Sequence, residues 1–288
     1  MAAAEYYAAR VDAVLTQRAR LRGVESSGDL VGDLETDHPL LKADPRRPRE
    51  GILKVLADLI EPLDIIVDVG GGAGRMSLPL ALRCRSLTNI DPSAKMGAAF
   101  LANAKDAGIS NVDLVRSDWL AANPPQGTVA LVNHVTYLTR DIVPFLEKLE
   151  FAGSRRVILT VNAPPPPSWN RVLFQLVYGE AEEVVPGHAE LMNVLWEMGR
   201  LPDLTMLQSQ SVRVIPSLPS RAAAIGFAMQ RVANEQWAHW PVTAALEARI
   251  RATVEQRFDD LYAQNADGFI PRWINMGREV LITWQPGK

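Results

Sequence analysis

Residues 66–76, IVDVGGGAGRM, limit most strongly what this chain can fold into. An apolar run leads directly into a cluster of glycines, and a helix-like pattern follows. Such a strand–glycine–helix turn is typical of parallel α/β sheets, where bare backbone lets a ligand approach closely. The stretch therefore predicts a buried strand that ends at a ligand site.

Short apolar runs alternate with helical patterns on both sides of this turn. This order predicts an α/β fold with a doubly wound, mostly parallel seven-stranded sheet covered by helices on both faces. The expected strands are 63–69, 87–90, 112–115, 129–133, 157–161, 278–284 and one within 204–215, and the expected flanking helices are 49–60, 74–84, 94–107 and 140–150.

The sheet pattern is interrupted twice, which predicts the domain organisation. Residues 1–48 read as an N-terminal helical and lid segment, with a helix over 4–22. Residues 49–288 read as one domain with helical cap insertions at about 163–202 and 212–277. The run Pro164–Pro167 cannot enter a central strand, and insertions at strand ends commonly build substrate pockets. Further helices are expected at 169–178, 188–199, 220–236 and 243–263.

The composition narrows the class of protein. A net charge of -3 disfavours a large nucleic-acid-binding face. One cysteine, Cys84, allows neither an internal disulfide nor a cysteine metal cluster, and we expect no metal site. The sequence shows no signal-peptide pattern and no apolar run of about 18 residues. We therefore expect a soluble, cytoplasmic protein.

The spacing of the glycines argues against a dinucleotide-binding loop. The pattern G-x-G-x-x-G begun at Gly70 needs a third glycine where Arg75 stands, and begun at Gly71 it meets Ala73. The pattern present is D-x-G-x-G-x-G, from Asp68 to Gly74.

This pattern resembles the first motif of class I S-adenosylmethionine-dependent methyltransferases. Later strand ends resemble further motifs of the same family in order, at Asn89–Ser93, Ser117–Trp119 and Leu131–Val135. The resemblance covers about residues 63–161 and implies a Rossmann-like methyltransferase fold. It also implies S-adenosylmethionine as cofactor, S-adenosylhomocysteine as product and a methyl acceptor as substrate.

The resemblance assigns the methionine and ribose ends of the cofactor. The glycines would leave room for the methionine part. Asp68 would help to hold its ammonium group, or would instead satisfy loop amides. Asp91 would accept from both ribose hydroxyls, since a carboxylate has two acceptor oxygens, or would cap a helix. Asn133 would offer its backbone carbonyl to the ammonium group.

The residues expected at the adenine end of the cofactor belong to less specific sequence patterns. Asp118 would accept from the adenine amino group, or would be a structural loop residue. Trp119 would pack near the ring or donate its backbone amide, with core packing as the alternative. Pro92 and Met96 would contact adenine or pack in the core. The full set of expected cofactor residues is Asp68, Gly70, Gly71, Gly72, Gly74, Asp91, Pro92, Met96, Ser117, Asp118, Trp119, Asn133 and His134.

His134 and Tyr137 are the candidate catalytic residues. Histidine can take a proton from a hydroxyl or an amine near neutral pH. The alternative for His134 is a neutral side chain that bonds to backbone or lines the pocket. Arg46 or Arg47 would pair with the cofactor carboxylate, or would be solvated. Candidate pocket-lining residues are Tyr6, Tyr7, His38, Trp169, Trp196, Trp237, Trp240 and Trp273.

The acceptor has no motif of its own, so several functions stay open. Charge favours a small-molecule acceptor over RNA or protein. A nicotinamide-dependent oxidoreductase would have a similar sheet, but this sequence lacks the glycine pattern of such enzymes. A cofactor-binding protein without transfer activity is the remaining alternative.

Overall fold

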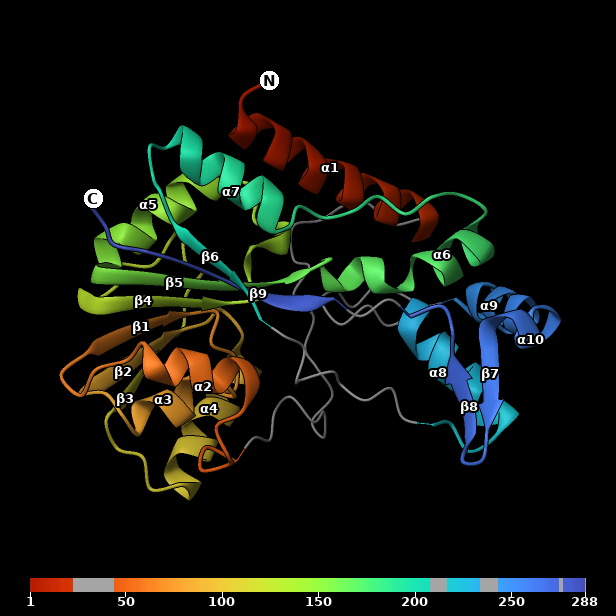
Figure 1. Ribbon diagram of the computed structural model, residues 1–288, viewed down its shortest axis with the longest axis horizontal. Coiled ribbons are helices and arrows are strands. Elements are labelled where there is room, and N and C mark those ends of the chain that lie inside the picture. Colours follow the sequence, from red (N-terminus) through yellow and green to blue (C-terminus); the bar gives the residue numbers. More distant parts are fainter. Residues whose placement is uncertain (23–43, 208–216, 234–242, 275–276, 288) are drawn as a thin grey trace.

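A seven-stranded sheet forms the centre of the computed structural model, which describes residues 1–22, 44–207, 217–233, 243–274 and 277–287 (Figure 1). The strand order is β3-β2-β1-β4-β5-β9-β6. Strand β9 pairs antiparallel with both of its neighbours, β5 and β6, and the other described pairs of this sheet are parallel, so the predicted fold class is confirmed. The strands are β1 (Ile65–Val69), β2 (Ser86–Ile90), β3 (Val112–Val115), β4 (Gly127–Asn133), β5 (Gly153–Ala163), β6 (Asp203–Met206) and β9 (Arg278–Trp284).

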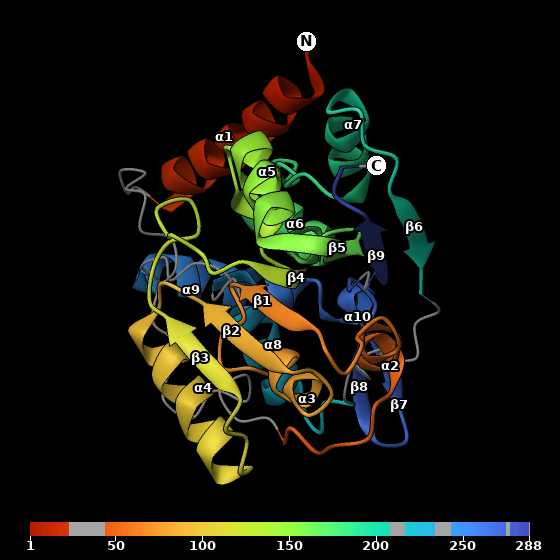
Figure 2. The same ribbon diagram turned by 90° about the vertical axis from the view of Figure 1, so that its left-hand side faces the viewer.

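Helices cover both faces of this sheet and give it two cores (Figure 2). Successive strand side chains point to opposite faces. Val67 of β1 therefore packs in the first core, while Ile66 packs in the second. The first layer holds α1 (Ala3–Arg22), α5 (Ile142–Ala152) and α7 (His188–Glu197), and the second holds α2 (Gly51–Asp58), α3 (Ser77–Ala81) and α4 (Ala94–Asp106).

The helix after the glycines is shorter than the expected span 74–84. It begins only at Ser77, because Gly74 has a left-handed φ of 84° that a right-handed helix does not accept. The chain then turns tightly at Leu82 into β2. By contrast, Ser93 caps α4 as expected, with its hydroxyl accepting from the Met96 amide at 3.2 Å.

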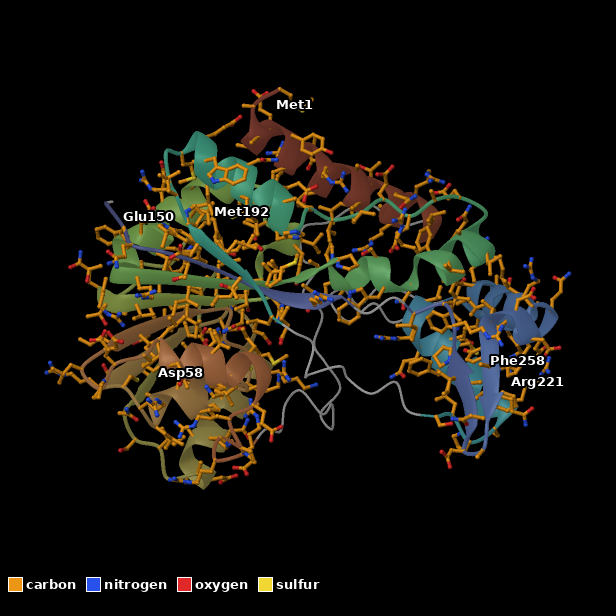
Figure 3. All side chains as sticks on the ribbon, viewed as in Figure 1. Met1, Asp58, Glu150, Met192, Arg221 and Phe258 are labelled. Atoms are coloured by element: carbon orange, nitrogen blue, oxygen red, sulfur yellow. The ribbon has the colours of Figure 1, made fainter. Side chains whose placement is uncertain are left out.

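A smaller unit with its own core lies beyond the sheet, at the right of Figure 1. Figure 3 labels two of its residues, Arg221 and Phe258, whose guanidinium and ring centroid are 4.0 Å apart. Its elements are η3 (Pro166–Asn170), α6 (Arg171–Tyr178), α8 (Arg221–Ala233), α9 (Ala244–Gln256), α10 (Phe258–Leu261), β7 (Tyr262–Asn265) and β8 (Gly268–Pro271).

Two features of this region differ from the expectation. Helix α7 lies within the expected insertion 163–202, yet Leu191 and Leu195 pack in the first sheet core. The helix expected over 243–263 gives way at Tyr262 to the β7–β8 hairpin. Gly268 permits this hairpin to bridge Leu218, because a Cβ there would lie 2.1 Å from the Leu218 carbonyl oxygen.

Helix α1 is packed firmly onto the sheet domain. Tyr7, Val11 and Val14 are fully buried in the first core. Gln17 donates to the Ala181 carbonyl at 2.7 Å and accepts from the Glu183 amide at the same distance. The helix therefore ties the segment between α6 and α7 to the sheet. None of the described helices combines the length and the apolarity needed to cross a bilayer.

A buried carboxylate is neutralised at the amino end of β1. Asp64 accepts from Arg155 through both oxygens, from the Thr128 hydroxyl at 2.6 Å and from the Glu61 amide at 2.7 Å. Burial alone would raise the pKa of Asp64, but these donors together hold it below its usual value. The network anchors β4 and β5 to the start of β1.

Removing the guanidinium should therefore destabilise the fold. We expect Arg155→Met to cost about 2 kcal/mol near pH 7, since it leaves a buried charge short of donors. The cost is present above about pH 4 and disappears as the pH falls through the folded pKa of Asp64. Urea unfolding at pH 7 and at a series of pH values stepped down below 4 measures both, and Lys54→Met, at an exposed pair with Asp58, should stay near wild type. Equal stability of Arg155→Met and wild type at pH 7 would contradict this account.

Candidate functional site

The glycine loop between β1 and α3 is held by side chains of the neighbouring strand β2. The Gly71 amide donates to Asn89 Oδ1 at 3.1 Å, and the Gly72 amide donates to Asp91 Oδ2 at 2.9 Å. Asn89 Nδ2 returns a bond to the Gly72 carbonyl at 2.9 Å. These two loop amides are therefore engaged within the protein and are not presented as a cradle for phosphate.

Two of the glycines are required by packing. A Cβ at Gly70 would lie 2.6 Å from Val135 Cγ2, and a Cβ at Gly74 would lie 2.6 Å from Leu78 and 2.7 Å from Phe100. Both residues also have left-handed φ angles. The contact of Gly70 with Val135 places the end of β4 directly beside the glycine loop.

The other two glycines differ in what surrounds them. A Cβ at Gly71 would lie 2.0 Å from Asp68 Oδ2, so the loop backbone rests on that carboxylate. A Cβ at Gly72 would meet only Met96 Sδ, at an ordinary 3.7 Å. Of these loop glycines, Gly72 thus has the open side where a ligand can lie against the backbone.

Asp68 is the anomalous group of the site. Its side chain is buried, and neither oxygen has a hydrogen-bond partner of good geometry among the described residues. Burial, together with the charge of Asp91, raises the pKa of Asp68 to about 7, and the nearby Ser77 hydroxyl offsets this only partly. Asp68 therefore does not satisfy the loop amides, which was the structural alternative for this residue.

Asp91 is held at the end of β2 with a defined orientation. Its Oδ1 accepts from the Ser93 amide and its Oδ2 from the Gly72 amide, both at 2.9 Å. Burial raises its pKa, and these two amides counteract the rise. Since Ser93 provides the helix cap, Asp91 is not the N-cap residue. Pro92 beside it is exposed, and Met96 lies across from Gly72.

The end of β3 contributes a turn and a core side chain. Asp118 is exposed and accepts from the Leu120 amide at 2.8 Å, and the Ser117 hydroxyl donates to the Asp118 carbonyl. The indole of Trp119 is buried against Phe145 and donates to its carbonyl at 3.2 Å. The Trp119 side chain thus packs in the core, which was the alternative to packing near adenine.

Asn133, the last residue of β4, has a buried side-chain nitrogen without a hydrogen-bond partner among the described residues. Its Oδ1 accepts from the Thr160 hydroxyl at 2.9 Å, which fixes the amide orientation. Its Nδ2 is buried without a hydrogen-bond partner in the described residues. A donor of this kind is costly unless another group accepts from it.

His134 and Tyr137 meet directly after β4. His134 has a φ of 58°, the only positive φ of a non-glycine residue among those described. Its Nδ1 lies 3.1 Å from the Tyr137 hydroxyl and 3.3 Å from Asn162 Nδ2. The Asn162 amide donates to the Tyr137 hydroxyl at 2.7 Å. Burial raises the pKa of Tyr137 far above its usual value.

Sequence reasoning missed two members of this cluster, Asn162 and Glu279. Glu279 Oε1 lies 3.6 Å from His134 Nε2, and the β5–β9 pairing sets Glu279 directly opposite Asn162. Neither residue belongs to a motif. Only the antiparallel return of β9 to the carboxyl end of β5 brings Glu279 to the site.

The two candidate arginines bond to backbone carbonyls, and three further candidates fall outside the described residues. Arg47 donates to the Arg75 carbonyl at 2.5 Å, and Arg46 donates to the Ala107 carbonyl at 3.0 Å. His38, Trp237 and Trp240 fall outside the described residues. Within the part of the chain that the structure describes, His, Cys, Asp and Glu side chains form no group of three suited to a metal ion.

Comparison with known proteins finds a methyltransferase domain within this chain. The sequence profile of a family described as "Methyltransferase domain" matches residues 66–150, from β1 to α5. The chain carries a class I S-adenosylmethionine-dependent methyltransferase domain. It is thus a methyltransferase that uses S-adenosylmethionine, and the oxidoreductase alternative is not favoured. A search of curated proteins found no match.

Solved structures agree with this methyltransferase in fold. YjhP from E. coli has a TM-score of 0.51 and 15% identity, over 87% of this chain and 97% of that one. The [4+2]-cyclase SpnF has a TM-score of 0.51 and 15% identity, over 99% of this chain and 97% of that one. At these identities the likeness concerns the fold alone.

The glycines of the methyltransferase loop should separate stability from cofactor binding. Gly74→Ala should cost about 2 kcal/mol or more, because a left-handed alanine is strained and strikes the core. Gly72→Ala should cost about 1 kcal/mol yet reduce S-adenosylhomocysteine affinity more strongly, because its Cβ enters the open side of the loop. Urea unfolding and calorimetric titration measure the two effects. Full affinity in folded Gly72→Ala would show that the ligand lies elsewhere.

Proposed function

We propose that this methyltransferase acts on a small-molecule acceptor bound between the sheet edge and the smaller unit. The cluster of His134, Tyr137, Asn162 and Glu279 beside the glycine loop is the observation that carries this proposal. The smaller unit stands beyond the carboxyl ends of β4 and β5, where ligands of α/β sheets bind (Figure 1). A net charge of -3 supports a small molecule over RNA.

The methionine end of the cofactor fits groups that lack partners in the protein. Asp68 would take the ammonium charge, while Asn133 would offer its backbone carbonyl to the ammonium and its Nδ2 to the carboxylate. Both side chains have buried polar atoms without partners in the described residues, and a Cβ at Gly72 would meet only Met96 Sδ, at 3.7 Å. A ligand that supplies the missing charge and acceptor would relieve their desolvation cost. Gly70, Gly71 and Gly74 would shape this loop.

The nucleoside end would lie along β2 and β3. Asp91 would accept from the ribose hydroxyls, since each of its oxygens has lone pairs beyond those used by Gly72 and Ser93. Met96 and Pro92 would provide apolar contact to adenine. In the turn after β3, Ser117 would line the adenine end, Asp118 would accept from its amino group, and Trp119 would donate its backbone amide.

At the methyl end, His134 would accept the proton that the acceptor loses, with Tyr137 beside it. Bound S-adenosylmethionine supplies an already activated methyl group, whose bond to sulfur breaks as the acceptor's lone pair bonds to carbon. The protein residues therefore align the acceptor, exclude water and remove one proton. The proposal includes a cytoplasmic location, which suits a chain whose single cysteine is free.

Removing the ribose carboxylate should weaken cofactor binding. We expect Asp91→Ala to reduce S-adenosylhomocysteine affinity by about tenfold to hundredfold, the range for hydrogen bonds to a charged group. Asp113→Ala removes an exposed carboxylate of β3 and should leave the affinity unchanged. Calorimetric titration, with thermal melting to confirm folding, compares the variants. Unchanged affinity in folded Asp91→Ala would disprove the ribose assignment.

Cofactor binding should also be linked to the proton on Asp68. With a pKa of about 7, the free protein holds this proton below neutral pH, whereas a bound ammonium group favours the ionised carboxylate. Affinity should therefore rise with pH, by up to about tenfold per unit below pH 7, and level off above it. Calorimetry from pH 5.5 to 8.5 tests this, and Asp68→Asn should remove the dependence. A flat wild-type profile would exclude the contact.

The class of acceptor has a separate test. Native mass spectrometry of the purified protein, followed by denaturation, should release S-adenosylhomocysteine or a small apolar compound. An RNA substrate would instead give binding of single-stranded RNA that weakens steeply with salt. Salt-dependent RNA binding together with methylation of that RNA would overturn the small-molecule proposal.

A further inference from the structure

His134 is oriented by three neighbouring elements at once. Its left-handed backbone, at the end of β4, turns the ring away from the strand direction. The ring then lies between the turn η2 (Thr136–Leu138), which carries Tyr137, and the paired residues Asn162 of β5 and Glu279 of β9. Strained backbone of this kind persists only where the surroundings hold it.

The neighbours of the two ring nitrogens are chemically different. Nε2 faces the Glu279 carboxylate at 3.6 Å, and a carboxylate ion can only accept. Nδ1 faces the Asn162 amide nitrogen at 3.3 Å, which can only donate, and the Tyr137 hydroxyl at 3.1 Å. The arrangement that suits every group has the proton on Nε2 and the lone pair on Nδ1.

The Tyr137 hydroxyl reinforces this choice. Its oxygen already accepts from the Asn162 backbone amide at 2.7 Å, so that side of the oxygen is occupied by a donor. The hydroxyl proton is then well placed to point toward Nδ1. Across the ring, the contact with Glu279 is an ion-pair distance and is longer than a normal hydrogen bond. The carboxylate acts on Nε2 mainly through its charge.

We propose that Glu279 is a positioning residue for methyl transfer, which holds His134 with its proton on Nε2 and so reserves Nδ1 for the acceptor's proton. This rests on the proposed role of His134 as the base. The acceptor's bond to hydrogen would break, and its electron pair would form the bond to the methyl carbon as the carbon–sulfur bond breaks. Because the Tyr137 hydroxyl faces Nδ1 at 3.1 Å, the acceptor's proton would pass to the Tyr137 oxygen while the Tyr137 hydroxyl proton moves to Nδ1. The imidazolium that results is balanced by Glu279 until the proton passes to water.

Glu279 is the one charged side chain for which the described residues show a contact with the His134 ring. From β5 the ring meets Asn162, and from η2 it meets Tyr137. The His134 backbone amide donates to the Thr160 carbonyl at 2.9 Å and is not available to the ring. The choice of tautomer therefore depends on Glu279 more than on any of these neutral groups.

Nitrogen NMR of histidine-labelled protein reads the tautomer directly, without an acceptor or a cofactor. The chain has four histidines, and His134→Asn assigns the signal because asparagine tolerates a left-handed backbone. At a pH where the ring is neutral, wild type should show protonated Nε2 and bare Nδ1. Glu279→Met, which removes the acceptor at nearly constant length, should shift the ring toward protonated Nδ1 donating to Tyr137.

Two further variants sharpen the result. Glu279→Gln removes the charge but keeps the size of the side chain, so it should shift the ring in the same direction as Glu279→Met, while Glu247→Met removes an exposed glutamate of α9 and should match wild type. Protonated Nδ1 in wild type, or an unchanged His134 signal in Glu279→Met, would overturn the proposal. If Glu279→Met does not fold, the wild-type and Glu279→Gln spectra still decide it.

A separate measurement keeps this proposal distinct from the proposed function. Glu279 faces the acceptor side, so Glu279→Met should bind S-adenosylhomocysteine within about twofold of wild type. A tenfold or greater loss would place Glu279 at the cofactor instead and overturn its assignment. Failure of wild type to bind S-adenosylhomocysteine would refute the proposed function whatever the tautomer.

Discussion

The bonds from β2 to the glycine loop are the interactions on which the rest of the site depends. Asn89 and Asp91 occupy the amides of Gly71 and Gly72, so the loop keeps a fixed shape. A phosphate would need those amides as donors. Because the protein's own side chains take them, the loop suits a ligand that brings a positive charge and a hydroxyl pair rather than a phosphate.

Buried polar groups have different surroundings at the two ends of the parallel strands. At the amino ends of the strands, Asp64 accepts hydrogen bonds from Arg155 and Thr128, which stabilises the folded state. At the carboxyl ends of the strands, Asp68 and Asn133 have buried polar atoms without partners among the described residues. Such atoms cost stability, and they occur in native proteins chiefly where a ligand or a function accounts for them. The contrast supports the proposed ligand site at the carboxyl ends of these strands.

Much of this fold could be predicted from the sequence because its signals are local. The apolar runs and the Ser93 cap predicted β1 to β4 and α4 closely, and the glycine spacing indicated the family. Strand β5 extends beyond its expected span 157–161 at both ends. The β7–β8 hairpin was missed because its residues continue a helical pattern, and its pairing depends on contact with Leu218. The Trp119 side chain could equally have faced adenine, and only tertiary packing against Phe145 decides its place.

Some residues of the candidate site also carry local sequence signals, and others do not. Asp68, Asp91 and His134 belong to motifs that follow strand ends, so their positions could be read along the chain. Glu279 lies far from them in sequence and reaches His134 only through the antiparallel pairing of β9 with β5. Asn162 carried no signal either, since an asparagine near a strand end has many ordinary uses. Contacts that depend on which strands pair, rather than on the spacing of residues along the chain, cannot be predicted until the fold is known.

The direct test of this account is a pair of calorimetric titrations of the wild-type protein, with S-adenosylhomocysteine and with NADH. If Asn89 and Asp91 take the loop amides and Asp68 awaits a positive charge, S-adenosylhomocysteine should bind one per chain and NADH should show no binding. Binding of NADH with equal or greater affinity would contradict the account, because the loop would then be accepting phosphate.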